Sequence, residues 1–317
     1  MIDIKNMHID LIYLWVDGND PEWLAIQNTF VGNSETSSST NCKGRYMDND
    51  ELKFSLRSVE KYAPWINQIY IITDNQTPEW IDLTNPKIKI IDHKHLMPQE
   101  ILPCYNSGVI ELFLYKIEGL SEHFIYANDD MFINNSVSPD TFFTNEGFPI
   151  IRLTRKNLRK LRWFWREKIR RKPLHNYSQS IKNASELVKK KFGIYYNGVP
   201  HHNIDAYLKS DYQRVSEQIF ENEFKAMQSN RLRNPKDIQR IVYSYVALAE
   251  KRGELQYSSK KESLHISIHK DRHYEKFKKY NPTFFCMNDS QYAQDSDRIK
   301  ATLFLSKLFP QKSQFEK

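Results

Sequence analysis

The sequence has few cysteines and few glycines. Its three cysteines, Cys42, Cys104 and Cys286, are far apart, and none belongs to a Cys-x-x-Cys pair. This pattern excludes a disulfide framework, gives no zinc-ribbon signature, and indicates a reducing compartment. Nine glycines among 317 residues are too few for a collagen-like chain and make a glycine-rich phosphate loop an unpromising hypothesis.

Long apolar runs are also missing. No run approaches the roughly 18 residues that a membrane span needs. The first residues, MIDIK, do not have the charged-then-apolar layout of a secretory signal. We therefore expect a cytoplasmic protein.

The residues that are present predict a folded enzyme-sized chain. A hydrophobic content of 40% beside 27% charged residues is typical of globular proteins, so disorder of the whole chain is excluded. The length suggests about two domains or one large one. The net charge of +7 fits nucleic acid, an anionic membrane or a phosphorylated substrate, and does not choose among them.

Strand and helix patterns alternate through about residue 150. This alternation predicts an α/β fold with a mostly parallel central sheet. The predicted strands are residues 9–16, 68–73, 87–92 and 123–127, and the predicted helices between them are residues 48–62 and 106–116. Residues 180–260 are predicted to be helical, with 238–251 the clearest case.

Polar turns follow three of the predicted strands, at residues 17–20, 74–76 and 128–130. Ligands of parallel sheets bind beyond the carboxyl ends of the strands, so these turns predict a binding edge. Asp and Asn are also common in turns for conformational reasons alone. Three such turns on one edge favour a site.

The strongest local signal is the triplet Asn128, Asp129 and Asp130, which follows an apolar strand. Nucleotide-sugar transferases of the A type (GT-A) hold a divalent ion with acids placed in this way, and the triplet resembles theirs. Oxygen ligands suit Mg²⁺ or Mn²⁺. A solvated turn is the alternative. Asn288 and Asp289 form a second pair of oxygen ligands near the C-terminus.

A second cluster surrounds the start of the helix predicted at 48–62. Acids at a helix N-terminus are favoured by the helix dipole, which accounts for Asp48 and Asp50 without a function. The flanking Arg45 and Arg57 are not explained in this way, and arginine pairs well with phosphate.

Further candidates lie at a predicted helix start and among the histidines. Asn106 and Ser107 open the helix that contains Glu111, and they could bind a sugar or phosphate or serve only as a cap. The adjacent His201 and His202, together with His265 and His269, are candidates for a general base at neutral pH, although most single histidines are structural.

Four stretches of the chain share the order and spacing of the conserved regions of one family. Residues 10–21 (DLIYLWVDGNDP) match its first region, and residues 45–93, with ITDNQ and PEW, match its second. Residues 183–205 resemble the third region more loosely, and FCMND at 285–289 resembles the fourth. The chain resembles the Stealth proteins, the hexose-1-phosphate transferases of bacterial capsules and surface polysaccharides, which have an animal relative.

This resemblance implies a reaction at phosphorus. A UDP-sugar would be the donor and a sugar hydroxyl the acceptor. The hydroxyl would attack the phosphorus next to the sugar, form a phosphodiester and release UMP, with Mg²⁺ or Mn²⁺ on the diphosphate. The acceptor would be a glycan or an undecaprenyl-linked oligosaccharide.

Roles follow for the residues named above. The catalytic candidates are Arg45, Asp50, Glu51 and His201, with His201 favoured slightly as the base. The substrate-binding candidates are Asp17, Gly18, Arg57, Asn106, Ser107 and Glu111, and the metal ligands are Asn128, Asp129, Asp130, Asn288 and Asp289. The parts would be a nucleotide-sugar-binding core at 1–150, a basic helical insertion on the acceptor side at 151–262, and a C-terminal segment at 263–317 that completes the site.

Residues 152–172 form a basic segment, with eleven Lys or Arg and one Glu around several large apolar residues. Such a segment contacts an anionic membrane, binds nucleic acid or is solvated. We expect peripheral membrane contact and no nucleic acid. The rival functions are an ordinary glycosyltransferase of the same fold, which would release UDP, and a non-enzymatic binder.

Overall fold

Four parallel strands and one antiparallel strand form the central sheet of the computed structural model, which describes residues 7–31 and 46–317. The strand order is β3 (Ile88–Asp92), β2 (Ile69–Thr73), β1 (Ile9–Leu14), β4 (His123–Asn128) and β8 (Asp205–Leu208). Only β8 runs antiparallel, beside β4. The prediction of an α/β fold with a mostly parallel sheet is confirmed.

Two smaller sheets flank the central one. The first has the order β10 (Ser263–Ser267), β11 (Phe284–Asn288) and β5 (Met131–Ile133). The second has the order β7 (Val199–Pro200), β6 (Ile150–Thr154) and β9 (Glu254–Tyr257). The turn at Asp129 and Asp130 connects β4 of the central sheet directly to β5 of the first small sheet.

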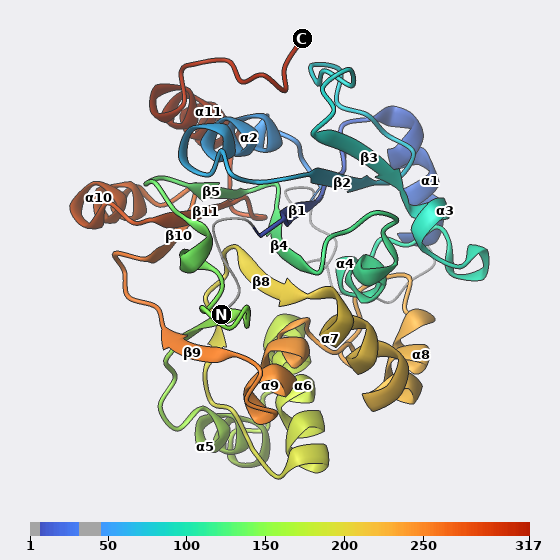
Figure 1. The fold of residues 1–317 in the computed structure, drawn as a ribbon. Coiled ribbons are helices and arrows are strands. Elements are labelled where there is room, and N and C mark those ends of the chain that lie inside the picture. The colour runs from blue at the N-terminus through green and yellow to red at the C-terminus, as the bar shows by residue number, and fades with distance from the viewer. Residues whose placement is uncertain (1–6, 32–45) are drawn as a thin grey trace.

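Helices cover both faces of the central sheet (Figure 1). On one face lie α2 (Glu51–Tyr62) and α11 (Asp295–Leu308), and on the other lie α4 (Ser107–Ile110), α6 (Asn176–Phe192) and α9 (Ile241–Ala249). The other helices are α1 (Pro21–Val31), α3 (His93–Leu96), α5 (Arg159–Phe164), α7 (Lys209–Arg214), α8 (Glu221–Gln228) and α10 (Asp271–Tyr280). Short 3₁₀ segments are η3 (Gln99–Ile101), η4 (Glu111–Lys116) and η5 (Pro139–Thr141), and π segments are η6 (Trp165–Ile169) and η7 (Val215–Ile219).

Alternation along the strands creates a hydrophobic core on each face of the sheet. On β1, Leu11 and Tyr13 pack in the core beneath α2, whereas Ile12 packs in the opposite core. Successive strand residues point to opposite faces, so a strand buried on both sides is apolar throughout. This explains why β1, β2 and β4 are mainly apolar, whereas the edge strand β3 carries the exposed Lys89.

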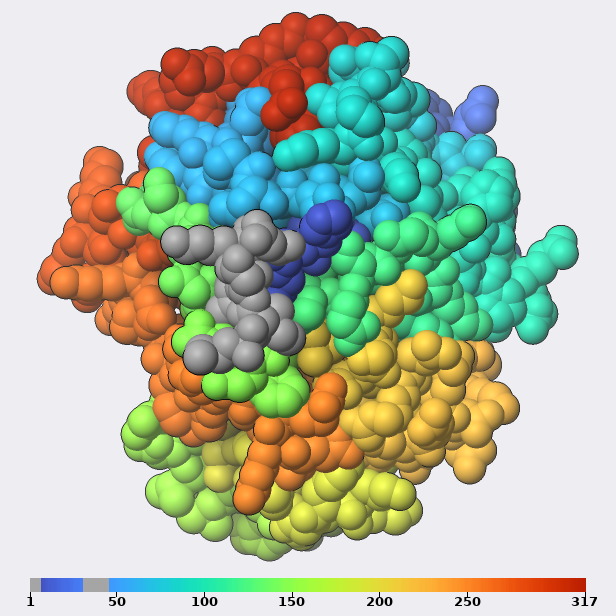
Figure 2. Space-filling model, viewed as in Figure 1, coloured from blue at the N-terminus to red at the C-terminus, as the bar shows by residue number. Residues whose placement is uncertain are grey.

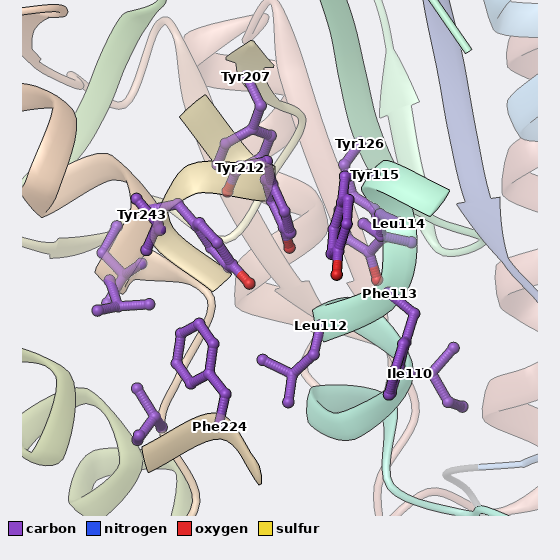
Figure 3. Close-up of a cluster of buried hydrophobic side chains, with 14 of the residues drawn as sticks. Ile110, Leu112, Phe113, Leu114, Tyr115, Tyr126, Tyr207, Tyr212, Phe224 and Tyr243 are labelled. Carbon is purple, nitrogen blue, oxygen red and sulfur yellow. The ribbon is translucent and has the colours of Figure 1, made fainter. Parts of the chain in front are cut away.

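An aromatic cluster joins the sheet to the C-terminal half of the chain (Figure 3). The rings of Tyr212 and Tyr243 stack with centroids 3.5 Å apart. The Tyr212 hydroxyl donates a 2.8 Å hydrogen bond to the backbone oxygen of Glu111. The cluster therefore fixes the start of η4 against α7 and α9.

The helical prediction for residues 180–260 is correct in α6 to α9 and wrong at three strands. Residues 199–200, 205–208 and 254–257 form β7, β8 and β9. Because β8 is short and pairs only at the sheet edge, its sequence carries no long apolar run. The three-part division of the chain stays a prediction, although β8 shows that residues 151–262 contribute a strand to the central sheet.

The C-terminal residues pack against the early part of the chain. Phe315 is buried in the core beneath α2, and Glu316 bridges to Ile81. In the space-filling view the red C-terminal atoms cover the blue atoms of α2 (Figure 2). No helix within the described ranges combines the length and hydrophobicity that a transmembrane span requires.

Candidate functional site

A cavity of about 770 Å³ opens at the carboxyl ends of the parallel strands. Leu14, Ile72 and Asn128, near the ends of three neighbouring strands, line it. Its size is within the range of ligand-binding pockets. The prediction of a binding edge at the strand ends therefore agrees with the structure.

The paired carboxylates of Asp129 and Asp130 lie on the cavity wall, half-buried. Asp130 Oδ2 accepts hydrogen bonds from Asn288 Nδ2 at 2.8 Å and from Cys286 Sγ at 3.1 Å. Asp130 Oδ1 is buried without a hydrogen-bond partner. The residue that carries this orphan acceptor lines the same cavity as the Asp129 carboxylate.

A chain of contacts runs from the acidic pair to a histidine. The imidazole of His265 contacts the side-chain oxygen of Asn288, whose amide donates to Asp130. The rings of His265 and His202 lie 5.5 Å apart, and both residues line the cavity. Burial, helped by the neighbouring His265, lowers the pKa of His202 to about 4. His202 is therefore neutral at pH 7 and able to accept a proton.

His201, the predicted base, faces away from the cavity. Its Nε2 lies 3.2 Å from Asp205 Oδ1, and its side chain is fully buried. The chain turns through a positive φ of 61° at His202, which directs the two adjacent rings to different places. His202 rather than His201 therefore reaches the cavity.

The buried guanidinium of Arg240 forms a second polar centre. It contacts Glu111 Oε1 at 3.1 Å and Asp205 Oδ2 at 3.2 Å, and it stacks 3.6 Å from the Tyr126 ring centroid. Two carboxylates thus balance one cation, as a buried charge requires. Glu111 is therefore a partner of Arg240 on the cavity wall rather than a free sugar ligand.

Ser107 and Arg233 form a third polar centre. Arg233 Nη2 donates a 2.9 Å hydrogen bond to Ser107 Oγ, and both line the cavity. No ion pair to Arg233 is found in the part of the chain that the structure describes. A cation of this kind on a cavity wall fits a phosphate.

Asn106 caps α4, and its side-chain amide already makes hydrogen bonds within the protein. Its side chain accepts from Gly108 N and donates to Asp237 Oδ2 at 2.9 Å. Of the two readings that the sequence left open, the structure favours the cap. Asn106 also holds residues 230–237 in place and so positions Arg233.

An aromatic group lies beyond the ends of β1 and β2. Trp23 packs against Tyr46 and Tyr105 with ring centroids 5.3 and 5.4 Å apart, and all three line the cavity. Trp23 Nε1 donates to Asp74 Oδ2 at 2.9 Å. Flat faces beside hydrogen-bonding groups suit a planar heterocycle.

Glu51, at the start of α2, is buried and lines the cavity. It accepts two hydrogen bonds from Asn49, at 2.6 and 2.8 Å. Burial raises the pKa of Glu51 to about 7, and burial together with Asp50 raises the pKa of Asp48 to about 6. Burial and mutual repulsion also raise the pKa of Asp129 well above its ordinary value. The site therefore concentrates acidic groups whose ionised forms are disfavoured unless a cation compensates them.

Some predicted residues do not line the cavity. Arg57 donates to Glu316 at 2.6 and 2.8 Å and to the Phe309 backbone oxygen, so it anchors the C-terminus. Asp50 pairs with Lys53 at 2.7 Å. The partner of Arg57 is distant in the chain, whereas Asp50 pairs with a lysine one helical turn away.

Asp17 and Gly18 act in the loop after β1. The Asp17 backbone bonds to the Gln76 side chain, and the Asp17 carboxylate accepts from Asn19. A Cβ atom on Gly18 would lie 2.1 Å from the Tyr46 backbone oxygen. Gly18 therefore allows Tyr46 to approach and positions that ring. Arg45 lies outside the described residues.

A divalent ion fits the acidic pair only with help from a ligand. Among the residues that the structure describes, no three His, Cys, Asp or Glu side chains are close enough to hold a metal ion by themselves. Asp289 is paired with Arg298 at 2.7 Å, and the Asn288 amide donates to Asp130. Asp129 and the orphan oxygen of Asp130 remain, and Mg²⁺ is commonly bound by one or two carboxylates with substrate phosphates.

The sequence prediction missed Arg233, Arg240 and the aromatic group, and it named His202 but preferred the adjacent His201. Arg233 and Arg240 come from a segment that the sequence predicted only as helical, and Trp23 lies in a segment for which the sequence predicted no element. His202 had a visible signal, because it adjoins the predicted base. Nothing local in the sequence distinguished the two histidines.

Two family models match this chain. Residues 7–25 match conserved region 1 of the Stealth proteins, and residues 45–151 match conserved region 2. The chain carries two Stealth regions. The predicted resemblance is confirmed there, and the third and fourth regions stay predictions. The Stealth regions contain the strands β1 to β4, the acidic pair and Glu51.

Curated relatives are named as phosphotransferases. Capsular polysaccharide phosphotransferase SacB of Neisseria meningitidis serogroup A is 30% identical over 330 residues, covering 98% of this chain and 57% of SacB. Exopolysaccharide phosphotransferase cps2G of Lactiplantibacillus plantarum is 43% identical over 141 residues, covering 44% of this chain and 41% of cps2G. The chain therefore spans about half the length of these relatives.

A solved structure of the galactosyltransferase LgtC, in complex with donor and acceptor sugar analogs, aligns with 96% of this chain and 98% of that one. The sequence identity is 11% and the TM-score is 0.46. The α/β class follows from the mostly parallel central sheet and the helices that cover it.

The raised pKa of Glu51 predicts a pH-dependent stability. Between its ordinary pKa of 4.5 and about 7, the folded protein binds more protons than the unfolded chain, so the free energy of unfolding falls as the pH rises. Glu51→Gln should remove on the order of 2–3 kcal/mol of that fall. Urea unfolding across this pH range measures it.

The matched control is Glu118→Gln at an exposed position, which should leave the pH slope unchanged. The slope is compared rather than the absolute stability, since glutamine also alters the bonds from Asn49. Equal slopes for the Glu51 variant and the wild type would contradict the prediction.

Proposed function

We propose that the protein transfers a hexose-1-phosphate from a UDP-sugar to a sugar hydroxyl, forming a phosphodiester and releasing UMP. The observation that supports this most is one cavity that holds an acidic pair with an orphan oxygen, an Arg233 with no ion pair to any described residue, and a neutral His202. The phosphotransferase names of the relatives and the Stealth regions support the same reaction class. Capsule or surface polysaccharide synthesis is the corresponding setting.

The donor would lie along the strand ends. Its uracil would stack in the aromatic group of Trp23, Tyr46 and Tyr105, and its diphosphate would lie between Arg233 and the acidic pair. Arg233 supplies positive charge to the phosphoryl oxygens. Ser107, which accepts a hydrogen bond from Arg233, keeps the guanidinium oriented.

Mg²⁺ or Mn²⁺, held by Asp129 and Asp130, would neutralise diphosphate charge. Without a cation, the two neighbouring carboxylates would repel the donor. Asn288 orients Asp130 through its amide, and Cys286 bonds to the same oxygen. The other oxygen of Asp130 is left free for a ligand.

His202 would act as the general base. The acceptor hydroxyl forms a bond from its oxygen to the phosphorus next to the sugar, and its proton passes to His202. The bond from that phosphorus to the bridging oxygen breaks, and UMP leaves with the electron pair. The lowered pKa of His202 keeps its ring unprotonated before the transfer.

The nucleotide product tests the reaction class. Incubation with a panel of UDP-sugars and a glycan or lipid-linked acceptor should yield UMP in equal amounts with new phosphodiester. Chromatography of the uridine nucleotides and ³¹P NMR of the product measure both. Release of UDP with a new glycosidic bond would establish the rival glycosyltransferase instead.

Asp130→Asn should abolish the metal-dependent step. With one carboxylate removed, the Mn²⁺-induced rise in melting temperature in the presence of UDP should disappear, and the rate should fall roughly 10²–10³-fold. Asp289→Asn is the matched control, because Asp289 is already paired with Arg298. A full Mn²⁺ response in the Asp130 variant would remove the metal assignment.

The two adjacent histidines should separate catalysis from stability. His202→Asn should lower kcat roughly 10²–10⁴-fold with little change in unfolding free energy. His201→Asn should instead cost about 1–2 kcal/mol of stability, because Asp205 loses a buried partner, and kcat should stay within a few-fold. Steady-state kinetics and urea unfolding of both variants decide it, and equal losses of kcat would refute the assignment.

A further inference from the structure

The helix that follows β6 turns its apolar side chains to solvent. The segments α5 and η6 form one helical stretch over residues 159–169. Its large apolar side chains, with the leucine just before it, are 46–64% exposed: Leu158, Leu161, Phe164, Trp165 and Ile169. A surface helix normally buries such residues and exposes its polar ones. In this helix the large apolar side chains are exposed together with the basic ones.

Polar contacts hold the opposite side of the helix to the protein. Arg159, Trp163 and Glu167, spaced four residues apart, are its only positions that are not exposed. Arg159 donates to Ser185 Oγ at 2.7 Å and stacks on Trp163, and Glu167 pairs with Lys182 at 2.6 Å. Both Ser185 and Lys182 belong to α6. The outward apolar face is therefore fixed in its orientation.

Positive charge surrounds the apolar face. The exposed basic residues are Arg155, Lys156, Lys160, Arg162, Arg166, Lys168, Arg170, Arg171 and Lys172. The single acid of this stretch, Glu167, is already paired with Lys182. The guanidinium of Arg170 lies over the Trp165 ring at 4.0 Å, so even a charged side chain shelters an apolar one. The surface thus combines net positive charge with apolar side chains.

We infer that this surface, Leu158 to Lys172, docks on an anionic lipid bilayer, with the helix lying in the plane of the interface. Aliphatic side chains such as Leu161 and Ile169 gain free energy only where an apolar interior receives them, which a bilayer offers and a nucleic acid does not. The basic residues add attraction to anionic headgroups. A second copy would bring like charges together, which disfavours self-association.

Docking would place the cavity beside the membrane. Only five residues separate Ile169 from His175, and His175, Tyr177 and Ser180 line the cavity. Figure 1 shows α5 at the outer edge of the molecule, next to α6. The consequence that the acceptor is lipid-linked rests on the proposed function. The docking itself does not.

Vesicle binding tests the inference. Wild-type protein should co-sediment with vesicles of one part phosphatidylglycerol to two parts phosphatidylcholine, and binding should weaken with added salt. The variant Leu161→Ser/Ile169→Ser should bind at least tenfold more weakly. Its matched control, Ile299→Ser/Leu303→Ser, alters two exposed apolar residues on α11 and should bind like the wild type.

Charge is tested in the same way. Arg162→Glu/Lys168→Glu should weaken binding about tenfold or more. The control Lys278→Glu/Lys279→Glu changes the same number of charges on α10 and should have a smaller effect. Trp165 fluorescence should shift to the blue on vesicle addition, and Trp165→Phe should lack this shift. Circular dichroism and melting of every variant confirm that it is folded.

Three results would overturn the inference: unchanged vesicle binding of the folded Leu161/Ile169 variant, dimerisation in sedimentation velocity that the same variant abolishes, or tighter binding to polyuridylate than to vesicles. These assays contain no donor or acceptor, so they are independent of the proposed reaction. If the reaction also holds, the Leu161/Ile169 variant should keep its rate on a soluble glycan acceptor and lose it on a vesicle-borne one.

Discussion

Negative charge gathered inside the molecule is the constraint around which this structure is organised. Asp129 and Asp130 lie where the chain passes from the central sheet into a smaller one, so their backbone is held by strands on both sides. Neither side chain can move away from the other without disturbing those strands. Desolvation and proximity disfavour two ionised carboxylates, and a cation or protons must compensate.

The buried charge of Arg240 is compensated by protein groups alone, without a ligand. Its guanidinium has two carboxylates, a tyrosine hydroxyl and an aromatic face as partners, so it is satisfied within the protein. The contrast between this closed centre and the open acidic pair distinguishes a structural ion network from a binding site. The stacked tyrosines of Figure 3 support the closed centre, because Tyr212 holds the backbone of Glu111.

The outward face of α5 and η6 is a second place where side chains lack an enclosing partner within the described part of the protein. Ion pairs, hydrogen bonds and the half-buried Trp163 anchor the helix, and its exposed apolar residues lie outside the core. Folding alone would favour the reverse orientation. Helix α6 links the two surfaces. Its first residues line the cavity at the strand ends, and its Lys182 and Ser185 hold the basic, apolar surface of α5 and η6.

The sequence by itself determined the α/β class, the parallel strands and the acidic turn, because buried strands are readable as apolar runs and polar turns end them. Glu51, Ser107, Asp129 and Asp130, which the sequence assigned to one site, all line the cavity at the strand ends. Boundaries were less certain, and β8 was missed as a short edge strand.

Only the tertiary structure decided which side chains within these motifs face the ligand cavity. The Arg57 side chain donates a hydrogen bond to Glu316, 259 residues away, and the Asn106 side chain donates one to Asp237, 131 residues away. A backbone turn at His202 exchanged the roles expected of two adjacent histidines. The partners that the Arg57 and Asn106 side chains bind are distant in the chain. A local sequence pattern shows the type of residue that a site requires, but it does not show which distant residue will contact it.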